Sequence, residues 1–330
     1  MKNQLLSTID LYPKNEYVDI PLSKRIDSDS NDFAYGQKIN YHIETNITKD
    51  IETYDHYYLE DKADASLEYL KETFKISIAG LTDQKFYERP IFSNEENAFR
   101  INFDPNKLSE HVGKKIEIDY QMIIKGNAEP DTDFTNEVTL HPGPHDSITK
   151  DQNVMTGGKR FIKIDSTNNA IHLPGAEFLV KNDNQMYLVK DVHGFSWTKN
   201  KTANNIFKLT SDKNGQFTIK GMQFGSYELQ EIHAPDGYML STTEIPFEIS
   251  RGSYLVNGQL ADPLKVVNKH QDKPKEPIDD SSEGKPLVGG LLPKTGEKVL
   301  EFIEAIGTIF IIVTGTLGIY TKMKNRKKLK

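Results

Sequence analysis

The chain has 330 residues, a formal net charge of −7 at pH 7, and 36% hydrophobic and 10% aromatic residues. This apolar content is sufficient for packed cores and excludes a wholly disordered chain, and the length favours two domains of roughly 100–200 residues each. The absence of cysteine excludes disulfides, cysteine-based zinc sites and a cysteine nucleophile. The acidic balance argues against nucleic acid as a partner.

The N-terminal segment, residues 1–16, carries one short motif. Residues 1–10 contain a single lysine and lack the apolar core of a signal peptide. The motif follows at Tyr12, Pro13 and Lys14. Because a proline restricts the preceding residue to extended backbone, we expect Lys14 to lie exposed in an extended segment.

Residues 17–141 are expected to form a first all-β domain. Short β-type runs, such as 75–78 and 115–124, are separated by glycine, asparagine and aspartate. This pattern is typical of a β-sandwich. Only residues 65–72 indicate a short helix.

Strand parity places three polar residues of this domain on its core face. Alternate residues of a strand share a face. Lys24, Asp61 and Asn136 each lie two residues from an apolar residue, on the first, a middle and the last expected strand. Glu60, on the opposite face, or Glu52, further upstream, replaces Asp61 if the register differs by one residue.

Residues 142–158 are expected to be a linker, since the segment begins with Pro-Gly-Pro and ends with Gly-Gly. His141 and His145 flank its start without a further cluster of ligands, so a rigid connector is favoured over a metal site. The acidic loop 27–32 departs from the calcium-loop pattern at its sixth and twelfth positions and is expected to be solvated. We therefore expect no metal and no cofactor.

Residues 159–270 are expected to form a second β-sandwich, with strands around 161–164 and 226–232 among others. Parity again places three polar residues where the core should be, one on each of three strands: Lys163, Glu231 and Asn268. Ile162 and Ile164 offer a rival inward face for the first of these strands.

Burying an unpaired lysine costs several kcal/mol, so such a set of residues must pair. Burial lowers the pKa of a lysine and raises that of a glutamate, which favours a neutral amine beside a protonated carboxyl. The Lys163 amine can then attack the side-chain carbonyl carbon of Asn268 while Glu231 transfers protons and ammonia departs. The product is an amide cross-link, and Lys24, Asp61 and Asn136 are the corresponding set in the first domain.

The C-terminal part divides into two segments. Residues 271–290 are rich in proline, glycine, serine and charge and indicate a flexible spacer. Residues 291–330 contain an uncharged apolar run at 305–320 and a basic end at 321–330, the pattern of a transmembrane segment with a cytoplasmic stop. Just before the run stands a pentapeptide: Leu292, Pro293, Lys294, Thr295 and Gly296.

This C-terminal arrangement resembles the LPXTG cell-wall sorting signal of Gram-positive surface proteins. The resemblance implies that a sortase cleaves the chain between Thr295 and Gly296 and passes the Thr295 acyl group to an amine. Residues 12–14 resemble the YPK pilin motif, which implies that Lys14 is the accepting amine. The expected partners are then a pilin-type and a housekeeping sortase, identical subunits, minor pilins, peptidoglycan, and the membrane before sorting.

The two domains also resemble known modules. Residues 173–178, 211–217 and 234–238 are similar in order to the Cna-B (SpaA-type) domain of Gram-positive adhesins and pilins. Residues 57–67 and 136–140 resemble the isopeptide-forming middle domain of major pilins. The resemblance implies Lys–Asn isopeptide bonds with Glu231 and Asp61 as the catalytic carboxyls.

The combined prediction is an all-β chain of two tandem Ig-like or Cna-type β-sandwiches followed by a sorting signal. We expect a structural shaft subunit of an extracellular, sortase-assembled pilus, not an enzyme, in a chain truncated at its N-terminus. The alternatives are a wall-anchored adhesin that binds a host protein and is never polymerised and, less favoured, a wall-bound enzyme.

Overall fold

The computed structural model describes residues 20–271, and these residues form two β-sandwiches. The N-terminal motif at 12–14, the spacer, the pentapeptide at 292–296 and the apolar run at 305–320 lie outside the described residues. Within the described part, no helix is long and apolar enough to cross a membrane. The prediction of an all-β chain with two tandem sandwiches is confirmed.

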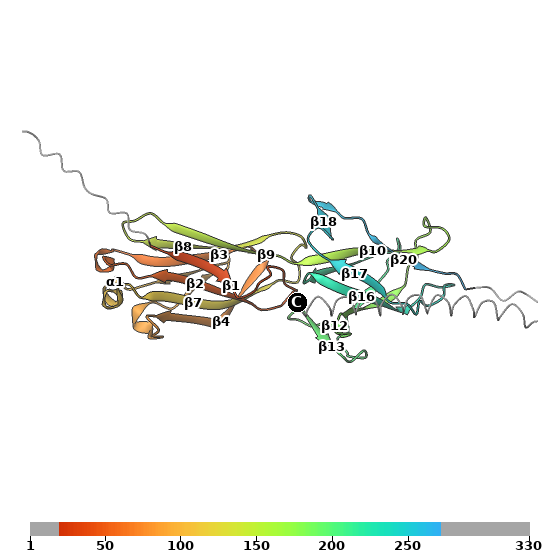
Figure 1. The fold of residues 1–330 in the computed structure, drawn as a ribbon, viewed down its shortest axis with the longest axis horizontal. Helices are drawn as coiled ribbons and strands as arrows, with labels where there is room; N and C mark the ends of the chain where they lie inside the picture. Colours follow the sequence, from red (N-terminus) through yellow and green to blue (C-terminus); the bar gives the residue numbers. More distant parts are fainter. Residues whose placement is uncertain (1–19, 272–330) are drawn as a thin grey trace, which may run out of the picture. The chain divides into compact units, whose positions relative to one another are not determined.

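The first sandwich packs a four-stranded sheet against a five-stranded sheet. The first sheet has the order β1-β2-β7-β4, formed by β1 (Leu22–Ile26), β2 (Ile39–Asn46), β7 (Lys115–Ile124) and β4 (Leu67–Ile78). The second has the order β5-β6-β3-β8-β9, formed by β5 (Ile91–Ser93), β6 (Ala98–Asn102), β3 (Tyr57–Ala63), β8 (Phe134–Pro142) and β9 (Ile148–Val154). Figure 1 shows β3 and β8 side by side, with β1, β2, β7 and β4 in the neighbouring layer.

Helical structure in the described residues is limited to short connections. They are η1 (Ile51–Thr53), η2 (Gln84–Phe86), α1 (Pro105–Leu108) and η3 (Ser109–His111). The short helix expected at 65–72 is wrong, because that stretch opens β4. Leu67 and Tyr69 point into the core while Glu68 faces solvent, and pairing with β7 outweighs the local helical preference.

The second sandwich packs a three-stranded sheet against a larger sheet. The smaller sheet has the order β15-β10-β20, formed by β15 (Gln216–Met222), β10 (Gly157–Asp165) and β20 (Leu264–Asn268). The larger sheet contains β13 (Phe195–Thr198), β12 (Tyr187–Lys190), β11 (Glu177–Asn182), β16 (Gly225–His233) and β17 (Ile245–Ile249), with β14 (Lys208–Thr210) paired to β11. A small hairpin joins β18 (Leu255–Val256) to β19 (Gln259–Leu260).

The segment 142–158, expected to be a linker, contains a strand of the first sandwich. β9 pairs with β8 in antiparallel register, from Leu140 opposite Ile148 to Phe134 opposite Val154. The Pro-Gly-Pro stretch is the turn between these strands, closed by a hydrogen bond from the His145 amide to the Pro142 carbonyl, 3.2 Å. Asn136 on β8 therefore lies on the last strand but one of its sandwich, and not on the last.

Each sandwich encloses its own apolar core. Alternation along the strands produces it: β7, for example, buries every second residue from Ile116 to Ile124. The second core includes Phe161, Phe178 and Phe217. The Phe217 ring stacks on the rings of both Phe161 and Phe178. Polar side chains inside these cores are consequently shielded from water, and they define the candidate site.

Candidate functional site

In the second sandwich, Lys163, Glu231 and Asn268 meet inside the core. Lys163 lies on β10 and Asn268 on β20, two neighbouring parallel strands of one sheet, while Glu231 projects from β16 of the facing sheet. The side chains of Lys163 and Glu231 are fully buried. The inward face of β10 is therefore the one that carries Phe161 and Lys163.

The contacts among these three side chains connect every group that the cross-linking reaction requires. The Lys163 Nζ donates a short hydrogen bond to Asn268 Oδ1 and lies 3.1 Å from Glu231 Oε1. The Asn268 Nδ2 donates to both carboxylate oxygens of Glu231 at 3.0 Å. One carboxylate thus touches both the attacking nitrogen and the nitrogen that would leave.

Neighbouring groups hold this arrangement in place. The Ser241 amide donates to Glu231 Oε2 at 2.7 Å, and Asn268 Nδ2 also donates to the Met239 carbonyl at 3.0 Å. Burial lowers the pKa of the Lys163 ammonium, although the Glu231 carboxylate opposes this shift. A larger fraction of Lys163 is therefore available as the neutral amine, which is the nucleophilic form.

In the first sandwich, Lys24 on β1 contacts Asp61 on β3 of the facing sheet, and both side chains are fully buried. The contact is a short hydrogen bond from Lys24 Nζ to Asp61 Oδ2. Burial lowers the pKa of Lys24 to about 8 despite the opposing effect of Asp61. Asn136 on β8 is also fully buried, and within residues 20–271 its Oδ1 has no hydrogen-bond partner.

Two tyrosines that the sequence analysis did not single out complete this cluster. The Tyr69 hydroxyl donates to Asp61 Oδ1 at 2.8 Å, and the Tyr120 hydroxyl lies 3.1 Å from each Asp61 oxygen. The Asn136 Nδ2 donates to the Tyr120 hydroxyl at 2.9 Å. Asp61 thus reaches Lys24 directly and Asn136 through Tyr120.

The two alternative carboxyls for this position lie elsewhere. Glu60 faces outward on β3, where its carboxylate lies 3.6 Å from Arg100 Nη1 and 3.5 Å from His141 Nε2. Glu52 is exposed on η1. Among the three carboxyls, Asp61 is the one that contacts Lys24.

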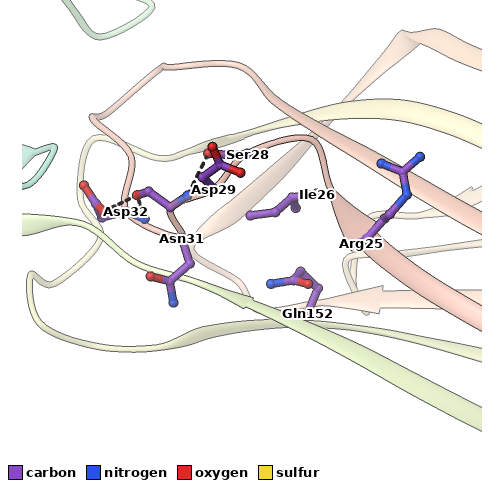
Figure 2. A pocket seen from close by; sticks show the side chains of 8 residues that line it. Arg25, Ile26, Ser28, Asp29, Asn31, Asp32 and Gln152 are labelled. Carbon is purple, nitrogen blue, oxygen red and sulfur yellow. Dashed lines mark hydrogen bonds between the residues drawn. The ribbon is translucent and has the colours of Figure 1, made fainter. Parts of the chain in front are cut away.

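Two further polar features carry no assignment. His42, Glu44 and Glu117 offer potential metal-ligand atoms within 4.8 Å of one another, but the Lys115 ammonium already lies 2.8 Å from Glu44. Figure 2 shows an open hollow along the acidic loop 27–32, where Ser30 donates to Asp32. The Arg25 guanidinium, labelled in Figure 2, is paired with the carboxylate of Asp27, which is not drawn there. In each feature a basic side chain of the protein already pairs with one of the acidic groups.

Comparison with known proteins identifies the second sandwich. Residues 157–261 match the model of the SpaA family, described as a prealbumin-like fold domain. The second sandwich is similar to this family over most of its length and is called the SpaA domain below. The matched range includes Lys163 and Glu231 and ends before Asn268. A search of curated proteins finds no match.

Solved structures show that the SpaA domain and the first sandwich together have the fold of major pilins. The full-length major pilin RrgB from Streptococcus pneumoniae superposes with a TM-score of 0.66 and 17% identity, covering 79% of this chain and 76% of that one. A 35 kDa C-terminal fragment of the major pilin GBS80 of Streptococcus agalactiae gives 0.61 and 21%, covering 76% and 100%. BcpA, the major pilin subunit of Bacillus cereus, gives 0.53 and 20%, covering 77% and 71%.

Proposed function

We propose that this chain is the shaft subunit of a covalent pilus on the surface of a Gram-positive bacterium. The observation that carries the proposal is the fully buried contact of Lys163, Glu231 and Asn268 inside the SpaA domain. Its support is the shared fold with major pilins and the two terminal motifs at 12–14 and 292–296. On this proposal the chain is a structural protein, and its own chemistry is a single self-cross-linking event in each sandwich.

In the SpaA domain the proposed reaction joins Lys163 to Asn268. The neutral Lys163 amine attacks Cγ of Asn268, and the new C–N bond forms as the Cγ–Nδ2 bond breaks. Glu231 accepts a proton from the attacking nitrogen and delivers one to Nδ2, which leaves as ammonia. The folded core holds the reacting groups together, which supplies the effective concentration that such slow chemistry needs.

The first sandwich carries the equivalent reaction between Lys24 and Asn136, with Asp61 as the carboxyl. Each bond would close a loop of more than a hundred residues, as the separation of 105 positions between Lys163 and Asn268 shows. Closure of loops of this length stabilises a fold by restricting its unfolded state, as a disulfide does. The proposed bonds would therefore provide covalent cross-links in a chain that contains no cysteine.

Polymerisation rests on the sequence motifs outside the described residues. In the proposed reaction a sortase cleaves between Thr295 and Gly296 and transfers the Thr295 carbonyl to the Lys14 amine of the next subunit. Each subunit then supplies one acceptor and one donor, so the product is a linear chain of identical subunits on the cell wall.

The test combines the purified full chain with a pilin-type sortase and follows high-mass products on denaturing gels. We expect a ladder from the wild-type chain and none from Lys14→Arg, with Lys2→Arg as the matched control that keeps the ladder. A ladder that persists in Lys14→Arg would contradict the assignment of the acceptor. No ladder from the wild-type chain, together with wall attachment of single copies, would favour the adhesin.

A further inference from the structure

The buried cluster of each sandwich contains a carboxyl beside a lysine amine and an asparagine amide, but the two carboxyl side chains differ in length. In the SpaA domain, Glu231 spans the distance from Lys163 Nζ, 3.1 Å away, to Asn268 Nδ2, 3.0 Å away. The corresponding residue of the first sandwich is Asp61, whose side chain is one methylene shorter. Asp61 accepts a hydrogen bond from Lys24, but among the described residues it makes no hydrogen bond to Asn136.

The hydroxyl of Tyr120 lies in the resulting gap. It is 3.1 Å from Asp61 and accepts a hydrogen bond from Asn136 Nδ2 at 2.9 Å. A continuous chain of hydrogen bonds therefore runs from Lys24 through Asp61 and Tyr120 to the nitrogen that must leave. Tyr120 is fully enclosed, and its ring stacks on Tyr41 and on Phe74, so its hydroxyl is held in position.

We propose that Tyr120 is a second catalytic residue of the first sandwich, beside Asp61, and that it relays a proton from Asp61 to the departing nitrogen of Asn136. This inference rests on the proposed cross-linking function and adds a residue to it. The SpaA domain needs no such relay, because Glu231 contacts both nitrogens itself.

Proton transfers accompany the replacement of one C–N bond of Asn136 by another. Lys24 gives one proton to Asp61, and its neutral nitrogen then forms a bond to Cγ of Asn136. Asp61 passes that proton to the Tyr120 oxygen while Tyr120 gives its own proton to Nδ2. The Cγ–Nδ2 bond breaks, ammonia leaves, and the former Lys24 nitrogen returns its surplus proton to Asp61.

Both hydrogen bonds of the Tyr120 hydroxyl reverse their direction during these steps, since before the reaction it donates to Asp61 and accepts from Asn136 Nδ2. Before the reaction, the lone pair of an amide nitrogen is delocalised, so Asn136 Nδ2 only donates to Tyr120. Addition of the amine makes Nδ2 a basic amine nitrogen that accepts a proton, and the hydroxyl can donate as readily as it accepts. Burial and the nearby Asp61 carboxylate raise the pKa of Tyr120 well above its usual value, so Tyr120 stays a phenol between transfers.

The experiment uses the full chain, purified as the wild type, Tyr120→Phe and Tyr69→Phe. Tyr69 is the matched control, since its hydroxyl donates a hydrogen bond to Asp61 at 2.8 Å, as that of Tyr120 does at 3.1 Å, but among the described residues it makes no hydrogen bond to Asn136. Protease digestion and tandem mass spectrometry quantify the Lys24–Asn136 and Lys163–Asn268 cross-linked peptides over time. The second cross-link reports in the same molecule that the chain has been made and folded.

We expect Tyr120→Phe to slow the Lys24–Asn136 reaction by roughly 100-fold, the usual scale of a lost proton-transfer group, and to leave the Lys163–Asn268 reaction unchanged. Tyr69→Phe should slow the first reaction much less. A wild-type rate in Tyr120→Phe, or equal slowing in both variants, would overturn the relay. Absence of both cross-links in the wild type would instead refute the proposed function itself.

A second variant distinguishes loss of the proton relay from a packing defect caused by Tyr120→Phe. Adding Asp61→Glu to Tyr120→Phe restores a carboxyl as long as Glu231 of the SpaA domain. We expect this double variant to recover the Lys24–Asn136 cross-link at least tenfold faster than Tyr120→Phe alone, on the scale of proton-transfer catalysis. A double variant as slow as Tyr120→Phe would count against the relay.

Discussion

The side-chain amine of Lys163 donates a hydrogen bond to the side-chain oxygen of Asn268 across two adjacent parallel strands, β10 and β20. These are the first and last strands of the SpaA domain. A bond between the two residues would carry tension past the whole domain. In the first sandwich, Lys24 and Asn136 lie on facing sheets, so their bond would join one layer to the other.

The SpaA domain should lose much of its stability when its cross-link cannot form. Asn268→Ala removes the electrophile and opens a loop of 105 positions, so the free energy of unfolding should fall by about 4 kcal/mol or more. Chemical denaturation of the full chain, followed by the fluorescence of Trp197 in β13, measures this change. An unfolding midpoint equal to that of the wild type would show that no bond stabilises this domain.

Glu231 should be required for the Lys163–Asn268 bond and not for the Lys24–Asn136 bond. Glu231→Ala removes the proton-transfer group and should slow formation of the Lys163–Asn268 bond by roughly 100-fold or more. Glu228→Ala is the matched control, because Glu228 lies on the same strand with its side chain on the opposite face. Cross-linked peptides counted by mass spectrometry give both rates, and equal rates in the two variants would refute the role of Glu231.

The uncross-linked first sandwich should become more stable as the pH rises from 8 to 10. The pKa of buried Lys24 is about 8 in the folded chain, whereas an unfolded lysine titrates near 10.4. Over this window the unfolded state binds more protons, so the free energy of unfolding rises with pH, by about 2 kcal/mol.

This pH effect is measured on Asn136→Ala, in which Lys24 stays a free amine. The reference is Lys24→Met/Asn136→Ala, which shares every other titrating group. The difference between the two unfolding free energies should grow toward pH 8, where Asn136→Ala is the less stable. A constant difference between pH 8 and 10 would show that Lys24 is not held in a desolvated site.

Tension should extend the first sandwich only beyond Asn136, at the end of β8 and in β9. These residues follow Asn136 and lie outside the loop that a Lys24–Asn136 bond would close. Detaching the residues from 136 to 156 would release at most about 70 Å of chain, at 3.3–3.6 Å per residue. Single-molecule pulling from the chain ends should show steps of this size or none, and extension by more than a hundred residues would exclude the bond.

The burial of the proposed cross-linking residues is easier to predict from the sequence than the contacts around them. Parity places Lys24, Asp61 and Asn136 each on the core-facing side of its own strand, because the two-residue period of a strand is local information. The parity of Tyr120 is equally visible, since it alternates with Ile118 and Met122. Its contact with Asp61 depends on how distant strands pair across the sandwich, which no local pattern records.

Two elements were misjudged for related reasons. β9 has mostly polar residues on an edge of its sheet, so it lacks the apolar alternation that marks a half-buried strand. β4 begins in a stretch with helical preference, and its state is decided by pairing with β7. In both cases, pairing with a strand distant in sequence determines that the segment is a strand, which its local sequence does not specify.

The intact mass of the purified full chain tests the central claim most directly. Each Lys–Asn bond releases one molecule of ammonia, so the account predicts a mass lower than that of the sequence by two ammonia molecules. Lys181→Met is the matched control, because buried Lys181 pairs with Glu244 at 2.6 Å and has no side-chain amide partner in the described part of the chain, so this variant should keep both losses. A wild-type mass equal to that of the unmodified sequence would contradict the account.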